Sequence, residues 1–330
     1  MRPPKIAILI PCYNEAAAIK TVVQDFRAVL PQATIYVYDN NSTDQTVEVA
    51  RNAGAVVRTE LQQGKGSVVR RMFRDIEADF YIMADGDGTY DAGVAPAMLQ
   101  LAMGGPYDLV NCIRRATEEA AYRGGHKFGN VLLTGVVRRI FGDRVQDMLS
   151  GYKVFSRRFV KSFPALSHGF DIETELTVHA LELSMPVTHV DGQYRGRVEG
   201  SESKLRTYRD GWRILMLIFK LVRHERPMFF FSLIAALFGA CSFGLLVPVV
   251  AEYLRTGLVP RLPTAILSMG MAMMACLSLV TGTVLDTVTR GRRETRMLAY
   301  LQHPAFSAIS GENPRVEGEM QPGNRPHSVI

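Results

Sequence analysis

Short apolar runs alternate with amphipathic segments along the first half of the chain. Residues 5–10 and 80–84 form apolar runs of strand length, a pattern typical of strands buried on both faces of a parallel sheet. Residues 15–30 carry apolar side chains at helical spacing, which predicts an amphipathic helix. Further strands are expected at 34–38, 55–58 and 108–112, and further helices near 44–53, 67–77, 94–103 and 170–183. This alternation predicts a doubly wound, mostly parallel α/β sheet, which binds ligands at the carboxyl ends of its strands.

Two later apolar runs are long enough to cross a membrane. Residues 228–251 and 262–285 contain no charged residue. Each run holds about 24 residues, or about 36 Å of helix, and therefore exceeds a hydrocarbon core of about 30 Å. Because residues 252–261 form only a short connection, both flanks lie on the same side. We therefore expect a two-helix transmembrane hairpin.

Basic residues gather beside this hairpin in a chain of 330 residues with a net charge of +6. The flanks carry Arg223, Arg226, Arg290, Arg292, Arg293 and Arg296, whereas the connection carries only Arg255 and Arg261. The positive-inside rule then predicts that the large N-terminal part and the C-terminus face the cytoplasm. Arginines beside a membrane span favour anionic lipids as partners over nucleic acid.

The remaining segments complete a four-part organisation: a domain at 1–205, a juxtamembrane segment at 206–226, the hairpin at 227–289, and a basic segment with a disordered tail at 290–330. Residues 206–226 mix bulky apolar and basic side chains, which predicts an interfacial amphipathic helix. An ordinary surface helix is the alternative. The four cysteines show no metal or disulfide spacing, as in proteins of a reducing compartment. Small residues in the first span would allow a homo-oligomer.

Carboxylates follow three of the expected strands. Glu15 comes soon after the first strand, Asp39 after the second, and Asp85 and Asp87 after the fourth. Side chains at positions i and i+2 of an extended segment share a face, so Asp85 and Asp87 can approach one cation. Two hard oxygen ligands suit Mg²⁺ or Mn²⁺ shared with a phosphorylated substrate. A polar turn is the alternative interpretation, because aspartate and glycine are common in turns.

Five motifs in order resemble the family 2 glycosyltransferases of GT-A fold. They are Pro-Cys-Tyr-Asn-Glu at 11–15, Asp-Asn-Asn-Ser-Thr-Asp at 39–44, Gly-Lys-Gly at 64–66, Asp-Gly-Asp at 85–87, and Asp-Met-Leu-Ser-Gly-Tyr-Lys at 147–153. The last motif, Gly-Ser-Glu-Ser-Lys-Leu at 200–205 and the two-helix tail resemble the polyprenyl-phosphate glycosyltransferases, such as dolichyl-phosphate mannose synthase. The resemblance covers roughly residues 5 to 290.

The resemblance implies a role for each matching residue. Nucleotide-sugar binding is implied for Pro11, Tyr13, Glu15, Asp39, Lys65 and Asp85, and metal binding for Asp85 and Asp87. Arg114, Arg195, Arg197 and Lys204 would bind the acceptor phosphate, and catalysis would rest on Asp87, Asp147, Arg195 and Lys204. Many relatives have glutamine where this chain has Thr89, so Asp91 or water is the alternative third metal ligand.

The implied function is an integral membrane enzyme of the bacterial inner membrane with its catalytic domain in the cytoplasm. It would move one sugar from a UDP- or GDP-sugar to a polyprenyl phosphate, with inversion and with Mg²⁺ or Mn²⁺. A phosphate monoester is already ionised at neutral pH, so this reaction needs no general base. One alternative is a family 2 enzyme acting on another lipid or on a polysaccharide. Another is a non-catalytic membrane scaffold.

Overall fold

The computed structural model describes residues 3–116, 146–165, 172–196 and 225–306, with positions 135, 216, 219 and 222–223. These residues form a sheet of seven strands, β1 (Ile6–Cys12), β2 (Thr34–Asp39), β3 (Val56–Thr59), β4 (Phe80–Met83), β5 (Leu109–Ala116), β6 (Lys153–Ser156) and β7 (Val187–Tyr194). The helices are α1 (Ile19–Val29), α2 (Thr46–Asn52), α3 (Lys65–Asp75), η1 (Ala92–Val94), α4 (Ala95–Gly104), α6 (Arg157–Ser162), α7 (Ile172–Glu182), α9 (Pro227–Thr256) and α10 (Leu262–Leu301).

The sheet is mostly parallel, as predicted. Its strand order is β3-β2-β1-β4-β6-β5-β7. β6 alone among these strands runs antiparallel to its neighbours, β4 and β5. The carboxyl ends of β1, β2 and β4 therefore meet at one edge, at which antiparallel β6 begins.

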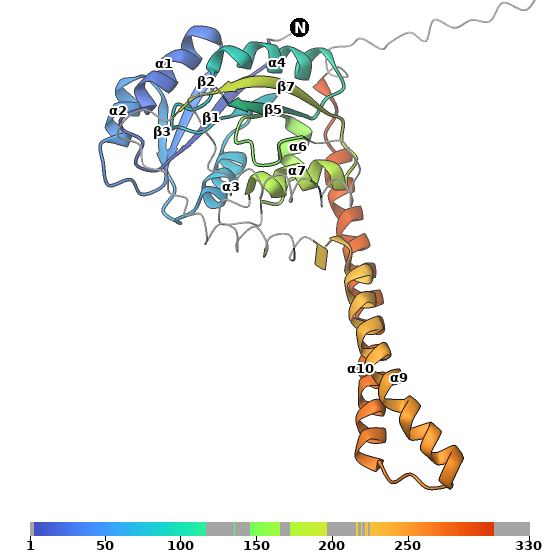
Figure 1. Ribbon diagram of the computed structural model, residues 1–330. Coiled ribbons are helices and arrows are strands. Elements are labelled where there is room, and N and C mark those ends of the chain that lie inside the picture. The colour runs from blue at the N-terminus through green and yellow to red at the C-terminus, as the bar shows by residue number, and fades with distance from the viewer. Residues whose placement is uncertain are drawn as a thin grey trace, which may run out of the picture.

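Helices cover both faces of the sheet (Figure 1). On one face, α1, α2 and α4 pack through apolar side chains such as Val23, Phe26 and Met98. On the other face, α3, α6 and α7 pack through side chains such as Met72, Phe159 and Leu176. The apolar strands β1 and β4 lie between the two layers, and their continuous hydrophobicity follows from burial on both sides.

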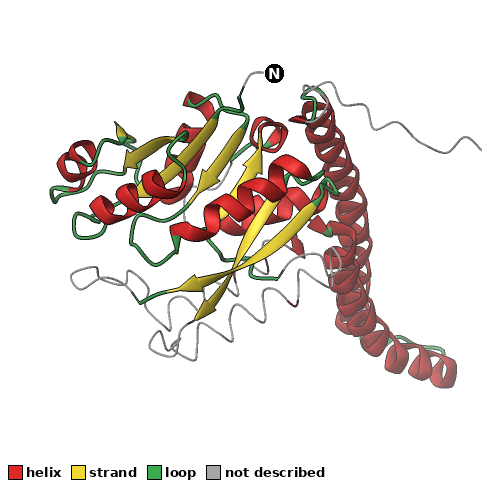
Figure 2. Ribbon diagram, turned by 90° about the horizontal axis from the view of Figure 1, so that it is seen from above, coloured by secondary structure: helices red, strands yellow, loops and turns green. Residues whose placement is uncertain are grey.

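The two apolar runs lie within α9 and α10, which pack side by side as an antiparallel hairpin (Figures 1 and 2). Both helices have the length and composition to cross a membrane. Only 17% and 11% of their most apolar windows are buried, so they are not core helices of the domain. Ser242 and Ser268 each donate a hydrogen bond to the carbonyl of the other, and Gly282 packs closely on Phe231.

α10 does not end where the sequence placed the border between hairpin and C-terminal segment. It continues through residue 290 to Leu301 and packs beside α6. At its end, the Tyr300 hydroxyl donates to Asp108 at 2.8 Å, and the Phe306 ring lies 5.1 Å from that of Phe80. Packing on the domain explains why the helix is not interrupted here.

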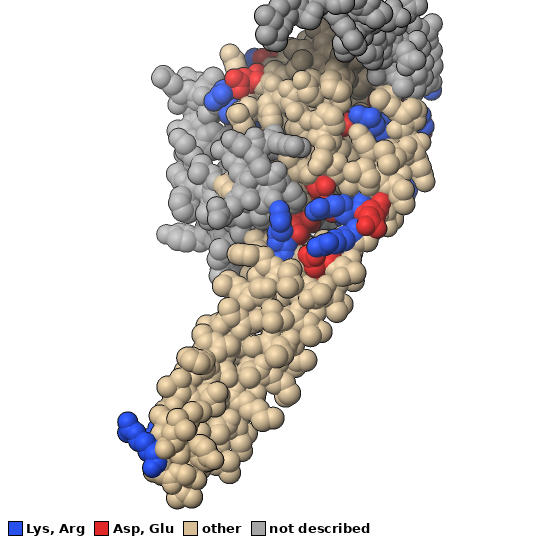
Figure 3. All heavy atoms as spheres, turned by 90° about the vertical axis from the view of Figure 1, so that its right-hand side faces the viewer, with Lys and Arg blue, Asp and Glu red and all other residues tan. Residues whose placement is uncertain are grey.

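A cluster of ion pairs lies where the hairpin meets the domain, and we call it the neck (Figure 3). It consists of Glu182, Glu225, Arg292, Arg293 and Arg296. The Glu182 carboxylate is fully buried and receives a hydrogen bond of 2.5 Å from Arg296. Burial and the neighbouring charge of Glu182 raise the pKa of Glu225. The neck thus ties α7 to α10 through buried charges.

Two predicted segments are not tested. Most of residues 206–226 and all of residues 307–330 lie outside the described residues. The interfacial helix and the disordered tail therefore stay predictions.

We expect Arg296→Met to lower the melting temperature of the detergent-purified protein. The variant leaves the buried Glu182 carboxylate without its nearest partner, which costs about 3 kcal/mol. Arg290→Met is the matched control, because its side chain is 78% exposed and its pair with Asp286 contributes at most about 0.5 kcal/mol. Equal losses in the two variants would contradict a stabilising role for the neck.

His179 predicts a specific acid sensitivity. Burial, aided by the charge of Arg296, lowers the pKa of His179 to about 3, against 6.5 for a free histidine. Between these values the unfolded chain binds a proton that the folded chain does not, so stability falls as the pH falls. Between about pH 7.5 and about pH 5 this loss reaches about 2 kcal/mol. Thermal denaturation of wild type and His179→Gln at both pH values should show a smaller drop in the variant, whereas equal drops would refute the assignment.

Candidate active site

The candidate site lies at the carboxyl edge formed by β1, β2 and β4. Cys12 and Asp39, the last residues of β1 and β2, are in register with each other. β4 pairs with the other side of β1, so the loop that follows Met83 begins at the same edge. The sheet therefore brings together the three carboxylate-bearing segments that the sequence predicted to converge.

The loops that follow β1 and β2 are tied together by hydrogen bonds. The backbone N–H of Asn14 donates to Ser42 Oγ at 2.9 Å, and that of Glu15 donates to Thr46 Oγ1 at 2.9 Å. In return, the Asn14 side chain accepts from the N–H of Thr43 at 2.8 Å. Three predicted donor-binding residues, Pro11, Tyr13 and Glu15, are half-buried in this region. A fixed loop pair of this kind can form the wall of a nucleoside site.

Asp39 is buried at the base of these loops and is 3% exposed. Its Oδ2 accepts from the backbone N–H of Ser42 at 3.2 Å. Its Oδ1 is buried and has no hydrogen-bond partner among the described residues. Since buried polar atoms are nearly always paired in folded proteins, an orphaned carboxylate oxygen points to a ligand that donates a hydrogen bond.

Asn40 organises the adjacent loop and was not singled out from the sequence. Its side-chain NH₂ donates to the carbonyls of Glu60 and Gln62, and its Oδ1 accepts from the N–H of Gly64 at 2.7 Å. Gly64 has φ of 125°, a conformation that favours glycine. Together they fix the start of α3 and hence the position of Lys65. Asn40 belongs to the motif at 39–44, but the motif alone does not predict these hydrogen bonds.

The two aspartates after β4 have different surroundings. Asp87 is 5% exposed, and its Oδ1 accepts from the Thr89 hydroxyl at 2.7 Å and from the Thr89 N–H at 3.2 Å. Thr89 thus orients a carboxylate. A Cβ added at Gly151 would lie 2.5 Å from Asp85 Oδ2, so only glycine leaves room beside this carboxylate.

Lys65 lies between two carboxylates. Its ammonium donates to Asp85 Oδ1 and to Glu173 Oε1, each at 2.5 Å. Burial alone would lower the pKa of Lys65, but the charges of Asp85 and Glu173 outweigh burial and raise it. Lys65 is therefore a permanent cation beside one of the two predicted metal ligands. Glu173 lies in the helix expected near 170–183, and no role was predicted for it.

Asp147 and Arg114 form a two-pronged ion pair. Arg114 Nε and Nη2 each donate to one oxygen of Asp147 at 2.8 Å, and the guanidinium lies 5.6 Å from the ring centre of Tyr194. Burial would raise the pKa of Asp147, but the hydrogen bonds and charge of Arg114 hold it below its ordinary value. Asp147 therefore stays ionised and fixes the direction of Arg114.

A second buried lysine lies behind this pair. Lys153 is fully buried and donates to Asn111 Oδ1 at 2.6 Å and to Thr177 Oγ1 at 3.3 Å. Burial lowers its pKa to about 8. Lys153 ends the motif at 147–153 and begins β6, but the sequence gives no sign of what its side chain faces.

Arg195 lies at the rim of the site. Its backbone N–H donates to the carbonyl of Thr89 at 2.9 Å, and its guanidinium is 3.7 Å from Asp91. Asp91 Oδ1 also accepts from the N–H of Gly93 and thereby caps η1. Arg197 and Lys204, two further predicted phosphate ligands, lie outside the described residues.

The third metal ligand has no clear candidate. Within the described ranges, no group of three histidine, cysteine, aspartate or glutamate residues could hold a metal ion. The Thr89 hydroxyl donates to Asp87, and the Asp91 carboxylate caps η1 and pairs with Arg195.

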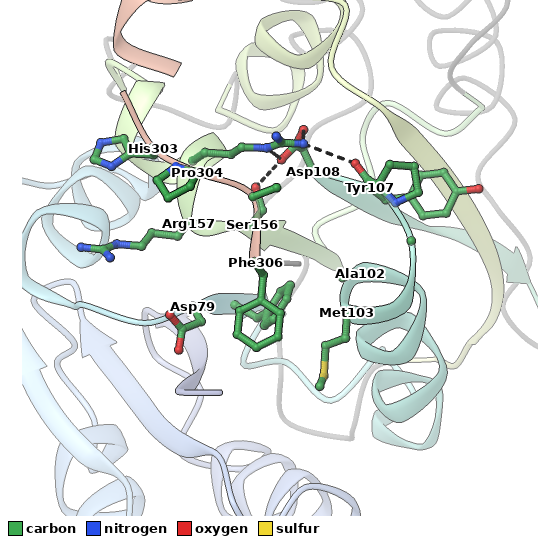
Figure 4. A pocket seen from close by; sticks show the side chains of 15 residues that line it. Asp79, Ala102, Met103, Tyr107, Asp108, Ser156, Arg157, His303, Pro304 and Phe306 are labelled. Carbon is green, nitrogen blue, oxygen red and sulfur yellow. Dashed lines mark hydrogen bonds and ion pairs between the residues drawn. The ribbon is translucent and has the colours of Figure 1, made fainter. Parts of the chain in front are cut away.

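A small hollow lies at the opposite edge of the sheet and is not the site. It is lined by the start of β4, the residue before β5 and the segment after α10, including Phe80, Asp108 and Phe306 (Figure 4). Its volume of about 50 Å³ is too small for a nucleotide sugar, since ligand pockets usually hold about 300 Å³ or more. The hollow lies where the C-terminal segment packs on the domain.

Comparison with known proteins places this geometry in context. The model of Glycosyl transferase family 2 matches residues 7–163. Glycosyltransferase AglJ of Haloferax volcanii is 33% identical over 294 residues, which are 88% of this chain and 96% of the relative. Dolichyl-phosphate hexose transferase of the same organism is 25% identical over 221 residues, or 67% of this chain and 95% of the relative.

The fold is also shared with a solved structure. Glucosyl-3-phosphoglycerate synthase from Mycobacterium tuberculosis, in complex with Mn²⁺ and UDP-glucose, superposes with a TM-score of 0.55 at 21% identity. The match covers 66% of this chain and 78% of that one, and supports the GT-A fold. Because its sheet carries this fold and a relative matches it along almost its whole length, the chain belongs to glycosyl transferase family 2 and is a glycosyltransferase.

Proposed function

We propose that this glycosyltransferase moves a single sugar from a UDP-sugar to the phosphate of a polyprenyl lipid, with inversion. The observation that carries the proposal is a buried donor site on a domain tied by buried ion pairs to two helices able to cross a membrane. Such an arrangement suits a water-soluble donor and a lipid acceptor. The name of the relative dolichyl-phosphate hexose transferase agrees with this acceptor class.

Asp39 supports uridine as the nucleoside. Uracil presents one ring N–H between two carbonyls, and guanine presents an N–H beside an NH₂ group, which together match both oxygens of a carboxylate. Asp39 Oδ1 has no hydrogen-bond partner among the described residues, whereas Oδ2 already accepts one hydrogen bond from Ser42. One unpaired oxygen beside one that is already engaged favours the single donor of uracil over the two donors of guanine.

The residues present fit a divalent cation. Asp85 and Asp87 supply hard oxygen ligands, and the lack of a side chain at Gly151 allows the Asp85 carboxylate to take its position in the site. Two protein carboxylates suit an ion that completes its coordination with the donor diphosphate and water. When bound, Mg²⁺ or Mn²⁺ would neutralise charge that develops on the departing nucleoside diphosphate.

On the acceptor side, the chain supplies cations and alignment. Arg114, held by Asp147, and Arg195 at the rim would bind the lipid phosphate. A phosphate oxygen forms the new bond to the anomeric carbon as the bond from that carbon to the diphosphate oxygen breaks on the opposite face. The acceptor phosphate is ionised at neutral pH, so no proton need be removed, and positioning and electrostatics supply the rate.

We propose a cytoplasmic orientation in a bacterial inner membrane. More basic residues flank the hairpin on the side of the domain than lie near its connection, which carries only Arg255 and Arg261. Arg290 is exposed there, whereas Arg296 is committed to the neck. The hairpin alone offers no path for a sugar, so transfer of the product across the membrane would need another protein.

Two alternatives lead to different outcomes. An enzyme that acts on another lipid or on a polysaccharide would use the same donor site with a different acceptor. A non-catalytic scaffold would not need an ion pair between Lys65 and Asp85 next to a second, buried carboxylate, Asp87.

The proposal is tested with detergent-purified protein, Mn²⁺, undecaprenyl phosphate and a panel of UDP- and GDP-sugars. We expect a lipid-phosphate sugar, detected by mass, from a UDP-sugar, and a loss of at least about a hundredfold in Asp87→Ala. Formation of product from GDP-sugars alone would refute the assignment of uridine. Donor turnover with water or another acceptor, but not with undecaprenyl phosphate, would refute the acceptor.

Asp147→Asn separates positioning from base catalysis. The amide keeps the size of the side chain but weakens the hold on Arg114. We expect the KM for the lipid phosphate to rise by about tenfold, with little change in the KM for the donor. A loss of kcat by about a thousandfold with both KM values unchanged would instead indicate that Asp147 acts as a base.

A further inference from the structure

Glu173 is a buried carboxylate whose role is not explained by the fold alone. It lies in the first turn of α7, 108 positions along the chain from Lys65, and is 6% exposed. Its Oε1 accepts from the Lys65 ammonium, which also donates to Asp85. A glutamate is rarely buried unless it is paired, and here its partner is a group of the donor site.

The Lys65 ammonium has one more hydrogen to donate. An ammonium carries three N–H groups, and the contacts within the described residues use two of them, toward Asp85 and Glu173. Four flexible bonds separate the charge from the backbone, so a single carboxylate would leave its direction undefined. Two carboxylates from different elements hold the nitrogen in one place and thereby define where the third N–H can act.

We propose that Glu173 is a positioning residue for the donor. It holds the Lys65 ammonium against Asp85 so that the third N–H meets an oxygen of the donor diphosphate. This inference rests on the proposed function, because it takes a nucleoside-diphosphate sugar as the ligand. It adds a residue of α7 to a donor site otherwise built from the N-terminal half of the sheet.

The helix that carries Glu173 is itself held firmly. Leu176 is fully buried against the sheet. The Thr177 hydroxyl donates to the backbone carbonyl of Glu173 at 2.9 Å and accepts from Lys153. α7 therefore fixes Glu173, and Glu173 in turn fixes Lys65. Preorganised charges of this kind add to donor affinity because little freedom is lost when the ligand binds.

Charge balance also favours this role over simple neutralisation. Asp85 and Glu173 share the ammonium of Lys65, and Asp87 lies two residues after Asp85. These three carboxylates and one ammonium leave two negative charges for a divalent cation. Without Glu173, Lys65 would pair with Asp85 alone and compete with the cation for that carboxylate. Glu173 draws part of the ammonium's charge away from Asp85. Asp85 can therefore bind both Lys65 and the cation.

The test is a double-mutant cycle on the full chain in detergent, with UDP binding measured by titration calorimetry in the presence of Mn²⁺. Glu173→Gln should weaken UDP binding by about tenfold. In a Lys65→Met background, the same substitution should change the affinity by less than about twofold, because its target is gone. Glu48→Gln, an exposed glutamate in the first turn of α2, is the matched control and should bind UDP as wild type does.

Each other outcome decides the matter. A tenfold loss in both backgrounds would overturn the proposal, since Glu173 would then act without Lys65. Should Glu173→Gln fail to fold, Glu173→Asp keeps the charge but withdraws it by about 1.5 Å, and it should weaken binding by about threefold. An unchanged affinity in Glu173→Asp would also overturn the proposal. Failure of wild type to bind UDP would refute the proposed function itself and this inference with it.

Discussion

The ion pairs of one lysine join three parts of the chain at the candidate donor site. Lys65 at the start of α3 contacts Asp85 after β4 and Glu173 in α7. The carboxylates of Asp85 and Glu173 both contact this one ammonium. Without the cation between them, they would repel each other strongly in a medium of low dielectric constant. The geometry of the site therefore depends on the position of Lys65. Asn40 fixes this position by accepting a hydrogen bond from the N–H of Gly64.

The features predicted correctly from the sequence are those encoded locally. The apolar strands, the two aspartates one residue apart after β4 and the uncharged runs of the hairpin can each be recognised within a short window. Pairings between distant segments cannot. Glu173 resembles any acidic residue of a helix until Lys65 is seen beside it. Lys153 resembles a strand lysine on the solvent side, yet it is fully buried.

The same distinction applies to the membrane end of the molecule. Charge content predicted a hairpin at 227–289 and a border near residue 290, because arginines begin there. In the structure these arginines lie within α10, and two of them pair with Glu182 of α7. The domain and the hairpin are thus coupled by a continuous helix of 40 residues. Such a helix is stiff, which favours a fixed orientation of the domain relative to the hairpin.

The contact between the C-terminal segment and the domain forms late in biosynthesis. Asp108 lies directly before β5, and Tyr300, which donates to its carboxylate, is synthesised 192 residues later. At a translation rate of about 5–20 residues per second, roughly 10 to 40 seconds separate the two. During this interval the ribosome produces both helices of the hairpin. The catalytic domain can therefore complete its packing only after the hairpin has been made, so its maturation is coupled in time to synthesis of the hairpin.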